Sequence, residues 1–125
     1  MRILIVDDAP ILRASFARIV TALGHSIAAE AATADEARSL ARDVQPDAIV
    51  VDGRLTGAGI VALISELRAA VPEASVFVTA ALDETALVRA AVAGGAAGAL
   101  RRPFSFTEIH ERLRSFKTSS SRDPA

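Results

Sequence analysis

The chain of 125 residues contains no cysteine, no tryptophan and no tyrosine. Without cysteine, disulfide bonds, thiolate zinc sites and thiol nucleophiles are excluded. Lysine is nearly missing as well, because all but one of the 14 basic residues are arginine and the exception is Lys117. The formal net charge of −1 argues against a surface whose main task is nucleic-acid binding.

Long hydrophobic runs are also scarce. The apolar run Ile3–Val6 is too short for a signal peptide and is followed by two acids. The longest mostly apolar stretch, Ala86–Leu100, is interrupted by Arg89 and by glycines, which is not the pattern of a transmembrane helix. Since 51% of the residues are hydrophobic, the composition is typical of a globular protein, and we expect one cytoplasmic domain.

Short β-favouring runs alternate with segments of helical periodicity along the whole chain. Runs without polar alternation suit strands that are buried on both faces of a parallel sheet. The expected strands are Ile3–Val6, Ser26–Ala29, the apolar run that ends at Asp52, Ser75–Thr79 and Gly98–Arg101.

Each expected strand is followed by an expected helix. Pro10 suits the first turn of a helix, and Thr33–Glu36 and Ser105–Glu108 have the pattern of capping boxes. Asp83 is expected to cap the helix after the fourth strand. The buried stripe of the last helix is predicted to consist of Phe106, Ile109, Leu113 and Phe116.

Five strand–helix repeats predict an α/β fold with a parallel sheet and helices on both faces. We expect the domain to span residues 1–117. Residues 118–125 belong to a polar, serine-rich segment that is predicted to be a disordered tail or the beginning of a linker. In such a fold the carboxyl ends of the strands meet at one edge of the sheet, where ligands bind.

Polar side chains stand at these strand ends. Asp7 and Asp8 follow the first strand, Asp52 ends the third, Thr79 the fourth and Arg102 the fifth. Three gathered carboxylates repel one another, and a divalent cation such as magnesium resolves this repulsion with oxygen ligands. Asp52 is then free to act as a nucleophile on phosphorus, with Thr79 and Arg102 stabilising phosphoryl oxygens.

The chain resembles the response-regulator receiver domain of two-component signalling over residues 2 to about 116. The motifs that carry the resemblance are Ile-Leu-Ile-Val-Asp-Asp (3–8), Val-Val-Asp (50–52), Val-Phe-Val-Thr-Ala (76–80) and Arg-Arg-Pro-Phe (101–104). They occur in the family's order and at nearly its spacing. The resemblance implies a doubly wound, flavodoxin-like three-layer sandwich of five strand–helix units, with strand order 2-1-3-4-5.

The resemblance also implies roles for individual residues. Asp52 matches the phosphorylated aspartate. Asp7 and Asp8 match the acid pair that holds Mg²⁺ together with Asp52, and the backbone carbonyl of Arg54 matches a further ligand. The phosphoryl-contacting and switch positions fall on Gly53, Thr79, Ala80 and Arg102. The bond between Arg102 and Pro103 is expected to be cis, as is typical of relatives.

Three features depart from the family pattern. The usual lysine is replaced by Arg102, or by Arg101 if the strand is shifted by one residue, and arginine is not equivalent to lysine. The aromatic switch position on the last strand is occupied by Ala99, so no ring can move there. The loop after Asp52 reads Gly-Arg-Leu-Thr-Gly-Ala-Gly and is one residue shorter than usual.

Three functional hypotheses follow. In the favoured one, Asp52 accepts a phosphoryl group from a sensor histidine kinase or a histidine phosphotransfer protein, and the domain signals through its partner surface without being classed as an enzyme. In the second, a pseudo-receiver binds its partner regardless of phosphorylation. The third, a flavodoxin-like small-molecule binder, ranks last because the first loop carries two acids where a phosphate loop is needed.

The output surface in relatives comprises the fourth helix, the fifth strand and the fifth helix. In this chain that region includes the small, smooth stretch Ala90–Ala99. The stretch suits close packing against a second copy of the chain or an effector, although an alanine-rich helix is also simply a good helix former. We expect no contact with nucleic acid or membrane.

Overall fold

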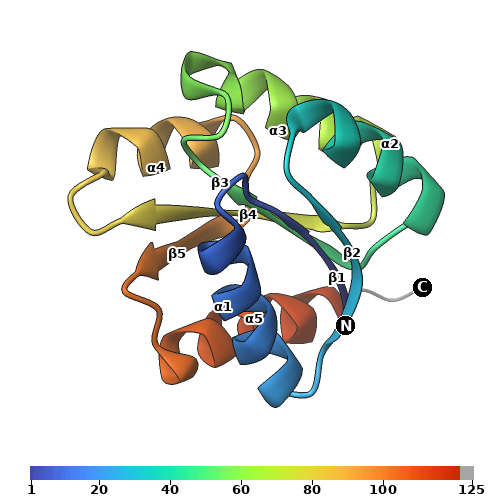
Figure 1. Ribbon diagram of the computed structural model, residues 1–125, viewed down its shortest axis with the longest axis vertical. Helices are drawn as coiled ribbons and strands as arrows, with labels where there is room; N and C mark the ends of the chain where they lie inside the picture. The colour runs from blue at the N-terminus through green and yellow to red at the C-terminus, as the bar shows by residue number, and fades with distance from the viewer. Residues whose placement is uncertain (122–125) are drawn as a thin grey trace.

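Five parallel strands and five α-helices alternate along the chain, as the computed structural model shows for residues 1–121 (Figure 1). For Ala58 and residues 115–121 it describes the backbone only. The elements are β1 (Arg2–Val6), α1 (Pro10–Ala22), β2 (Ser26–Ala31), α2 (Ala34–Val44), β3 (Ala48–Asp52), the 3₁₀ turn η1 (Gly57–Gly59), α3 (Ile60–Ala70), β4 (Ser75–Ala81), α4 (Thr85–Ala93), β5 (Gly98–Arg102) and α5 (Phe106–Ser121).

All five strands belong to one sheet with the order β2-β1-β3-β4-β5. Each pair of neighbouring strands is parallel. The observed order is the one that the resemblance to the receiver family implied. Strand β2 extends two residues beyond the expected Ala29. The carboxyl ends of β1, β3, β4 and β5 therefore share one edge of the sheet.

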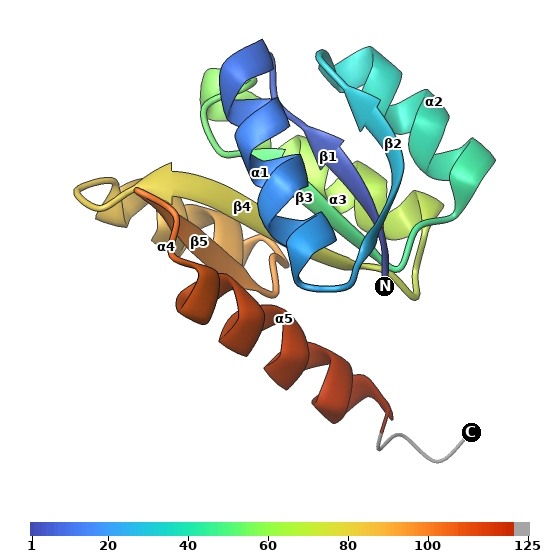
Figure 2. The same cartoon turned by 60° about the horizontal axis from the view of Figure 1, so that its bottom comes forward.

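The sheet separates two hydrophobic cores. Successive strand residues point to opposite faces, so Ile3 and Ile5 join one core and Leu4 and Val6 the other. The first core includes residues of α1 and α5, and the second includes residues of α2, α3 and α4. Figures 1 and 2 show this division, with α1 and α5 together on one face and α2, α3 and α4 on the opposite face.

Two helices begin as their capping patterns predicted. Thr33 Oγ1 accepts the Glu36 N–H at 3.1 Å, and Ser105 Oγ accepts the Glu108 N–H at 3.3 Å. The Glu36 carboxylate accepts the Ala32 N–H at 2.9 Å, so the first turn of α2 is also bonded to the residue that precedes Thr33. These bonds satisfy backbone donors that a helix leaves unpaired at its first turn.

Two expectations about helices are wrong. The residue at the start of α4 is Glu84 rather than Asp83, because the Glu84 carbonyl accepts the first helical N–H, that of Val88. Phe106 is 54% exposed. Phe104 is instead the partly buried residue that packs against the core, where it meets the Phe16 ring edge-on at a centroid distance of 5.2 Å.

The last helix extends past the expected end of the domain. Ile109 and Leu113 are buried as predicted, whereas the side chain of Phe116 lies outside the described residues. The backbone of α5 is helical to Ser121, so the start of the expected tail is helical here. The remainder of that segment, 122–125, lies outside the described residues, and the domain boundary stays a prediction.

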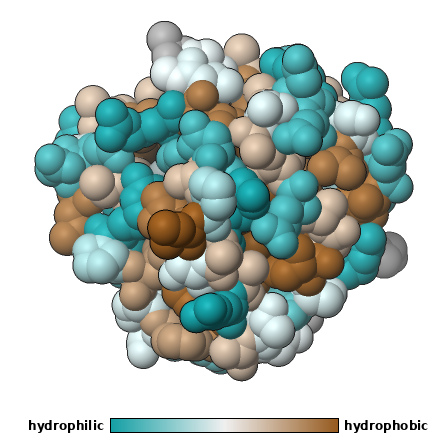
Figure 3. All heavy atoms as spheres, in the orientation of Figure 1, coloured by the Kyte–Doolittle hydropathy of each residue, from teal (hydrophilic) through white to brown (hydrophobic). Residues whose placement is uncertain are grey.

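The surface mixes hydrophilic and hydrophobic residues. Figure 3 shows hydrophobic residues in separate groups between hydrophilic ones on one face. The large hydrophobic residues that are exposed are Ile11, Val61, Leu82, Val92 and Phe106. Scattered apolar residues of this kind are ordinary on folded proteins. Within residues 1–121, no helix is sufficiently long and apolar to cross a membrane.

Candidate functional site

Three carboxylates meet at the carboxyl edge of the sheet. Asp7 and Asp8 follow β1, and Asp52 is the last residue of the neighbouring strand β3. One oxygen of each carboxylate lies within 4.8 Å of the corresponding oxygens of the other two. Asp7 is buried, Asp52 is partly buried and Asp8 is exposed, so the cluster opens to solvent on one side.

Backbone groups hold two of these carboxylates in place. Asp7 Oδ1 accepts the Ala9 N–H at 2.8 Å, and Asp52 Oδ1 accepts the Arg54 N–H at 3.2 Å. Arg13 Nη1 donates to the Asp7 carbonyl at 2.6 Å and fixes the loop that follows β1. Asp52 Oδ2 accepts no hydrogen bond from the residues that the structure describes.

The cluster is electrostatically unfavourable on its own. Burial raises the pKa of Asp7 above its ordinary value of 3.8, and the charges of Asp52 and Asp8 raise it further. The Ala9 N–H and the Arg102 guanidinium act in the opposite direction. An oxygen-only donor set that carries this much uncompensated negative charge fits a hard divalent cation such as Mg²⁺.

The backbone carbonyl of Arg54, the fourth predicted ligand, already accepts one hydrogen bond. The Arg54 carbonyl accepts the Gly57 N–H at 3.3 Å. A carbonyl oxygen has a second lone pair, so this weak bond still leaves it able to bind a cation. The role of the Arg54 carbonyl therefore stays a prediction.

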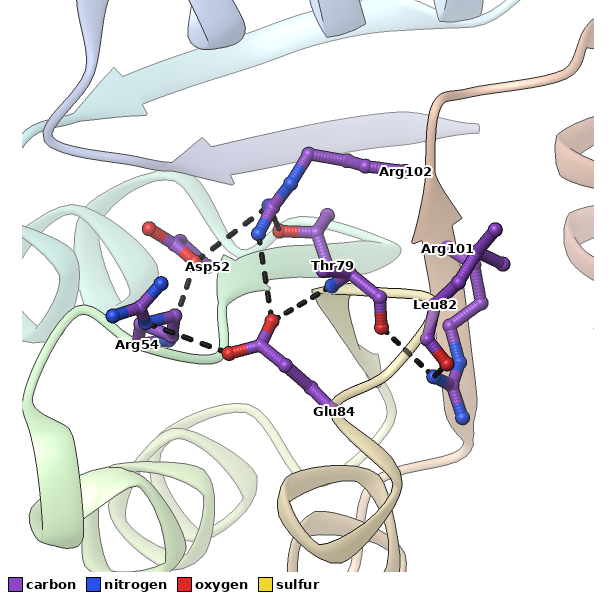
Figure 4. A network of polar contacts seen from close by, with 8 residues as sticks. Asp52, Arg54, Thr79, Leu82, Glu84, Arg101 and Arg102 are labelled. Carbon is purple, nitrogen blue, oxygen red and sulfur yellow. Dashed lines mark hydrogen bonds and ion pairs between the residues drawn. The ribbon is translucent and has the colours of Figure 1, made fainter.

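A hydroxyl and a guanidinium flank the carboxylates. Arg102 Nη1 donates to Thr79 Oγ1 at 3.1 Å and lies 3.8 Å from Asp52 Oδ1 (Figure 4). The Arg101 side chain lies at the end of β4, where its Nη1 donates to the carbonyls of Ala81 and Leu82. Of the two arginines that the sequence left open, Arg102 is thus the one at the site. The bond between Arg102 and Pro103 is cis, as predicted.

Comparison with known proteins decides the family. The family model of the response regulator receiver domain matches residues 3–114. The chain belongs to this family. Receiver domains of two-component response regulators are signalling domains rather than enzymes themselves, and they bind Mg²⁺ at an acidic pocket.

Similar proteins cover almost the whole receiver domain. The chemotaxis protein CheY of Thermotoga maritima is 30% identical over 112 residues, which are 90% of this chain and 93% of CheY. A LuxR-family response regulator from Aurantimonas has a TM-score of 0.79 at 28% identity, over 96% of this chain and 84% of that one. NtrX from Brucella abortus, solved with ATP, has a TM-score of 0.86 at 26% identity, over 96% of this chain and 27% of that one.

The remaining predicted positions of this receiver domain, Gly53, Ala80 and Ala99, are buried or nearly so. Gly53 is buried, and a Cβ there would lie 2.9 Å from Leu87 Cδ2 and 3.0 Å from the Thr79 carbonyl oxygen. The absence of a side chain at Gly53 therefore lets α4 and β4 pack directly on the Asp52 loop. Ala80 is fully buried, and Ala99 is 5% exposed within the core under α4.

Sequence reasoning missed Glu84. Its Oε2 lies 3.4 Å from Arg54 Nε and its Oε1 lies 3.7 Å from Arg102 Nη2. Oε1 also accepts the Ala81 N–H at 2.7 Å. The motif pattern assigns no role to this position, and the sequence predicts the adjacent Asp83 as the cap. One signal for Glu84 was available in the sequence. It is an acidic residue in the loop after β4, and an arginine at the site, Arg102, can form an ion pair with such a residue.

Proposed function

We propose that Asp52 accepts a phosphoryl group from a phosphohistidine of a sensor histidine kinase or a histidine phosphotransfer protein. The observation that carries the proposal is the position of Asp52 within the carboxylate cluster. Its Oδ1 is held by the Arg54 N–H, while Oδ2 accepts no hydrogen bond from the described residues. One oxygen is thus anchored and the other is free to attack phosphorus.

In the transfer step, an Asp52 oxygen forms a bond to phosphorus while the bond between phosphorus and the donor imidazole nitrogen breaks. The electron pair of the broken bond stays on the imidazole. Arg102 lies within 3.8 Å of the Asp52 carboxylate and compensates charge on the phosphoryl oxygens. The Thr79 hydroxyl accepts a hydrogen bond from Arg102 and keeps its own proton to donate to a phosphoryl oxygen.

Asp7, Asp8 and Asp52, with the Arg54 carbonyl, are the residues that would hold Mg²⁺. When bound, this ion supplies positive charge that offsets the repulsion among the carboxylates and the phosphoryl oxygens. Asp7 is buried and fixed by the Ala9 N–H, so it would provide a rigid ligand. Asp8 is exposed to solvent and would provide a second carboxylate ligand.

We further propose that modification of Asp52 changes the surface formed by α4, β5 and α5, in a cytoplasmic signalling pathway. A second copy of the chain and an effector protein are the two candidate partners for this surface. Because Ala99 replaces the usual aromatic residue, the change has to pass through other residues than a moving ring. Neither nucleic acid nor membrane is a direct partner in this proposal.

A pseudo-receiver that binds its partner without phosphorylation is the second candidate function. Arg102 in place of lysine, Ala99 in place of an aromatic residue and the short loop after Asp52 favour it. The complete set of three carboxylates favours phosphorylation instead, because a phosphorylation-independent surface has no use for a buried, electrostatically unfavourable Asp7.

Intact-mass spectrometry tests the proposal. The protein is incubated with acetyl phosphate and Mg²⁺ beside three controls, which are Asp52→Asn, chelator in place of Mg²⁺, and Asp83→Asn. We expect one phosphoryl adduct in the wild type and in Asp83→Asn, and none with Asp52→Asn or chelator. If neither acetyl phosphate nor a phosphorylated histidine donor protein yields an adduct, the proposal is refuted and the pseudo-receiver remains.

A further inference from the structure

The Arg102 guanidinium lies between two carboxylates at nearly equal distance. Nη1 is 3.8 Å from Asp52 Oδ1, and Nη2 is 3.7 Å from Glu84 Oε1 (Figure 4). Both distances exceed the usual 2.7–3.2 Å of a hydrogen bond between nitrogen and oxygen. Among the described residues, the one hydrogen bond that this side chain donates is to Thr79 Oγ1 at 3.1 Å. Arg102 therefore interacts with both Asp52 and Glu84. A change of charge at either residue makes its interaction with Arg102 stronger or weaker relative to the other.

Glu84 also pairs with the second arginine of the site. Its Oε2 lies 3.4 Å from Arg54 Nε, so a single carboxylate contacts the guanidinium groups of both Arg54 and Arg102. Arg54 is 73% exposed, whereas Glu84 and Arg102 are each 20% exposed. The Arg54 contact is the shorter of the two, but the Arg102 contact is less screened by solvent, so we expect the Arg102 contact to be the stronger.

Glu84 closes the turn that leads into α4. Its Oε1 accepts the Ala81 N–H at 2.7 Å, and its own N–H donates to the Ala81 carbonyl at 3.1 Å. The Glu84 carbonyl accepts the N–H of Val88 in the first turn of α4. The Glu84 side chain thus connects Arg102 directly to the turn between β4 and α4.

The first turns of α4 also touch the Asp52 loop. The close approach of Leu87 to Gly53 places this helix against the residue that follows the phosphorylation site. Any movement of the Glu84 turn is therefore transmitted to a helix that is already packed on the site. This route does not involve Ala99.

We propose that Glu84 is a positioning residue that competes with the phosphoryl group for Arg102 and, more weakly, for Arg54. In the unmodified domain Glu84 holds both guanidinium groups. A phosphoryl group on Asp52 adds negative charge on the opposite side, draws the guanidinium groups toward it, and releases the Glu84 carboxylate. The release changes the turn between β4 and α4, so Glu84 takes the reporting role that an aromatic residue has elsewhere in the family. This inference rests on the proposed phosphorylation of Asp52.

Coupling of this kind is reciprocal. If occupancy of Asp52 weakens the contacts of Glu84, then removal of the Glu84 charge strengthens binding at Asp52 by the same factor. Partly exposed ion pairs each contribute a factor of about 1.5 to 5. With both contacts at the low end, and with the exposed Arg54 contact limited to about twofold at the high end, we expect Glu84→Gln to raise the affinity for a phosphoryl mimic about twofold to tenfold.

The test measures binding of beryllofluoride, a tetrahedral phosphoryl mimic, in the presence of Mg²⁺. Glu84→Gln keeps the shape of the side chain and an oxygen that can accept the Ala81 N–H, so only the charge is removed. Asp83→Asn is the matched control, because Asp83 is exposed and makes no hydrogen bond or ion pair with the described residues. We expect tighter binding with Glu84→Gln and an unchanged affinity with Asp83→Asn.

A double-mutant cycle shows whether Glu84 acts through Arg102. In an Arg102→Ala background, Glu84→Gln is expected to change the affinity by less than about twofold, because only the exposed Arg54 contact is left. A merely structural role of Glu84 would give the same effect in both backgrounds. In parallel, the Ala81 amide resonance is expected to shift on binding in the wild type, since its acceptor is released.

The outcomes separate the two proposals. A wild-type adduct that needs Asp52, together with Glu84→Gln binding beryllofluoride as the wild type does, overturns the role of Glu84 and leaves phosphorylation standing. The same holds if Glu84→Gln has an equal effect with and without Arg102. Absence of any adduct on Asp52 overturns both proposals.

Discussion

Replacement of Asp7 by asparagine should make the domain more stable in the absence of metal. Asp7 is buried beside Asp8 and Asp52, and burial together with these two charges disfavours its ionised form. The asparagine side chain keeps an oxygen that can accept the Ala9 N–H, which Asp7 Oδ1 accepts at 2.8 Å. The substitution therefore removes the charge and leaves the hydrogen bond.

The expected magnitude follows from the geometry. The three carboxylates have oxygens within 4.8 Å of one another. Two unit charges at that separation repel by about 3.5 kcal/mol at an effective dielectric constant of about 20, and by about 0.9 kcal/mol in bulk water. Because Asp8 is exposed and Arg102 partly compensates Asp7, we expect Asp7→Asn to increase the free energy of unfolding by about 1–2 kcal/mol at neutral pH.

The pH dependence has a defined sign. The raised pKa of Asp7 means that the folded protein holds this proton more tightly than the unfolded chain does. The contribution of protonated Asp7 to stability is complete below 3.8, its ordinary value, and is lost as the pH rises through the raised folded pKa. The stability advantage of Asp7→Asn over the wild type should therefore be absent at low pH and grow across this window.

Urea unfolding in chelator and in Mg²⁺ measures these effects. Mg²⁺ at ten times its Kd adds about 1.4 kcal/mol to the wild type, and it should add much less to Asp7→Asn, which lacks a ligand. Asp83→Asn serves as the control with one exposed charge removed. The reasoning is refuted if Asp7→Asn is no more stable than the wild type in chelator, or if Mg²⁺ stabilises both proteins equally.

Three further predictions concern other parts of the site. Gly53→Ala should lower the free energy of unfolding by about 1–3 kcal/mol, because its Cβ would meet Leu87 and the β4 backbone. Urea unfolding measures this loss, and an unchanged midpoint would contradict the close packing at Gly53. Arg102→Ala should slow adduct formation on Asp52 by at least about tenfold, since a positive charge beside the phosphoryl group is lost. An intact-mass time course measures the rate, and a rate equal to that of the wild type would show that Arg102 has no part in the transfer. Ala99→Tyr should destabilise the domain by about 1–3 kcal/mol, because Ala99 lies in the core at 5% exposure and a much larger side chain would overpack it. Thermal unfolding checks this, and an unchanged melting temperature would show that the core accommodates a ring there.

Much of the fold follows from local sequence patterns. Continuous apolar runs such as Ile3–Val6 can be buried only between two helical layers, and alternation with amphipathic segments leaves few topologies besides a parallel sheet. The gathering of Asp7, Asp8 and Asp52 followed from the same logic, because the carboxyl ends of parallel strands share an edge. These predictions depend on residue type and order alone.

Other features depend on strand register and on packing between residues far apart in the chain, which local sequence patterns do not specify. The sequence could not decide between Arg101 and Arg102, because the choice depends on where β5 pairs with β4. The expected burial of Phe106 was wrong, because Phe104 is the aromatic residue that packs against Phe16, far away in the chain.

The role of Glu84 is the clearest case of a feature that only the tertiary structure decided. Asp83 and Glu84 are adjacent acids, and although Asp is the better N-cap residue, the helix begins after Glu84. That one-residue difference places a carboxylate between Arg54 and Arg102, which come from two other segments of the chain. The sequence determined which charged groups the site contains, because strand ends converge. The tertiary structure determined which of them make contact, because ion pairs depend on distances between residues far apart in the chain.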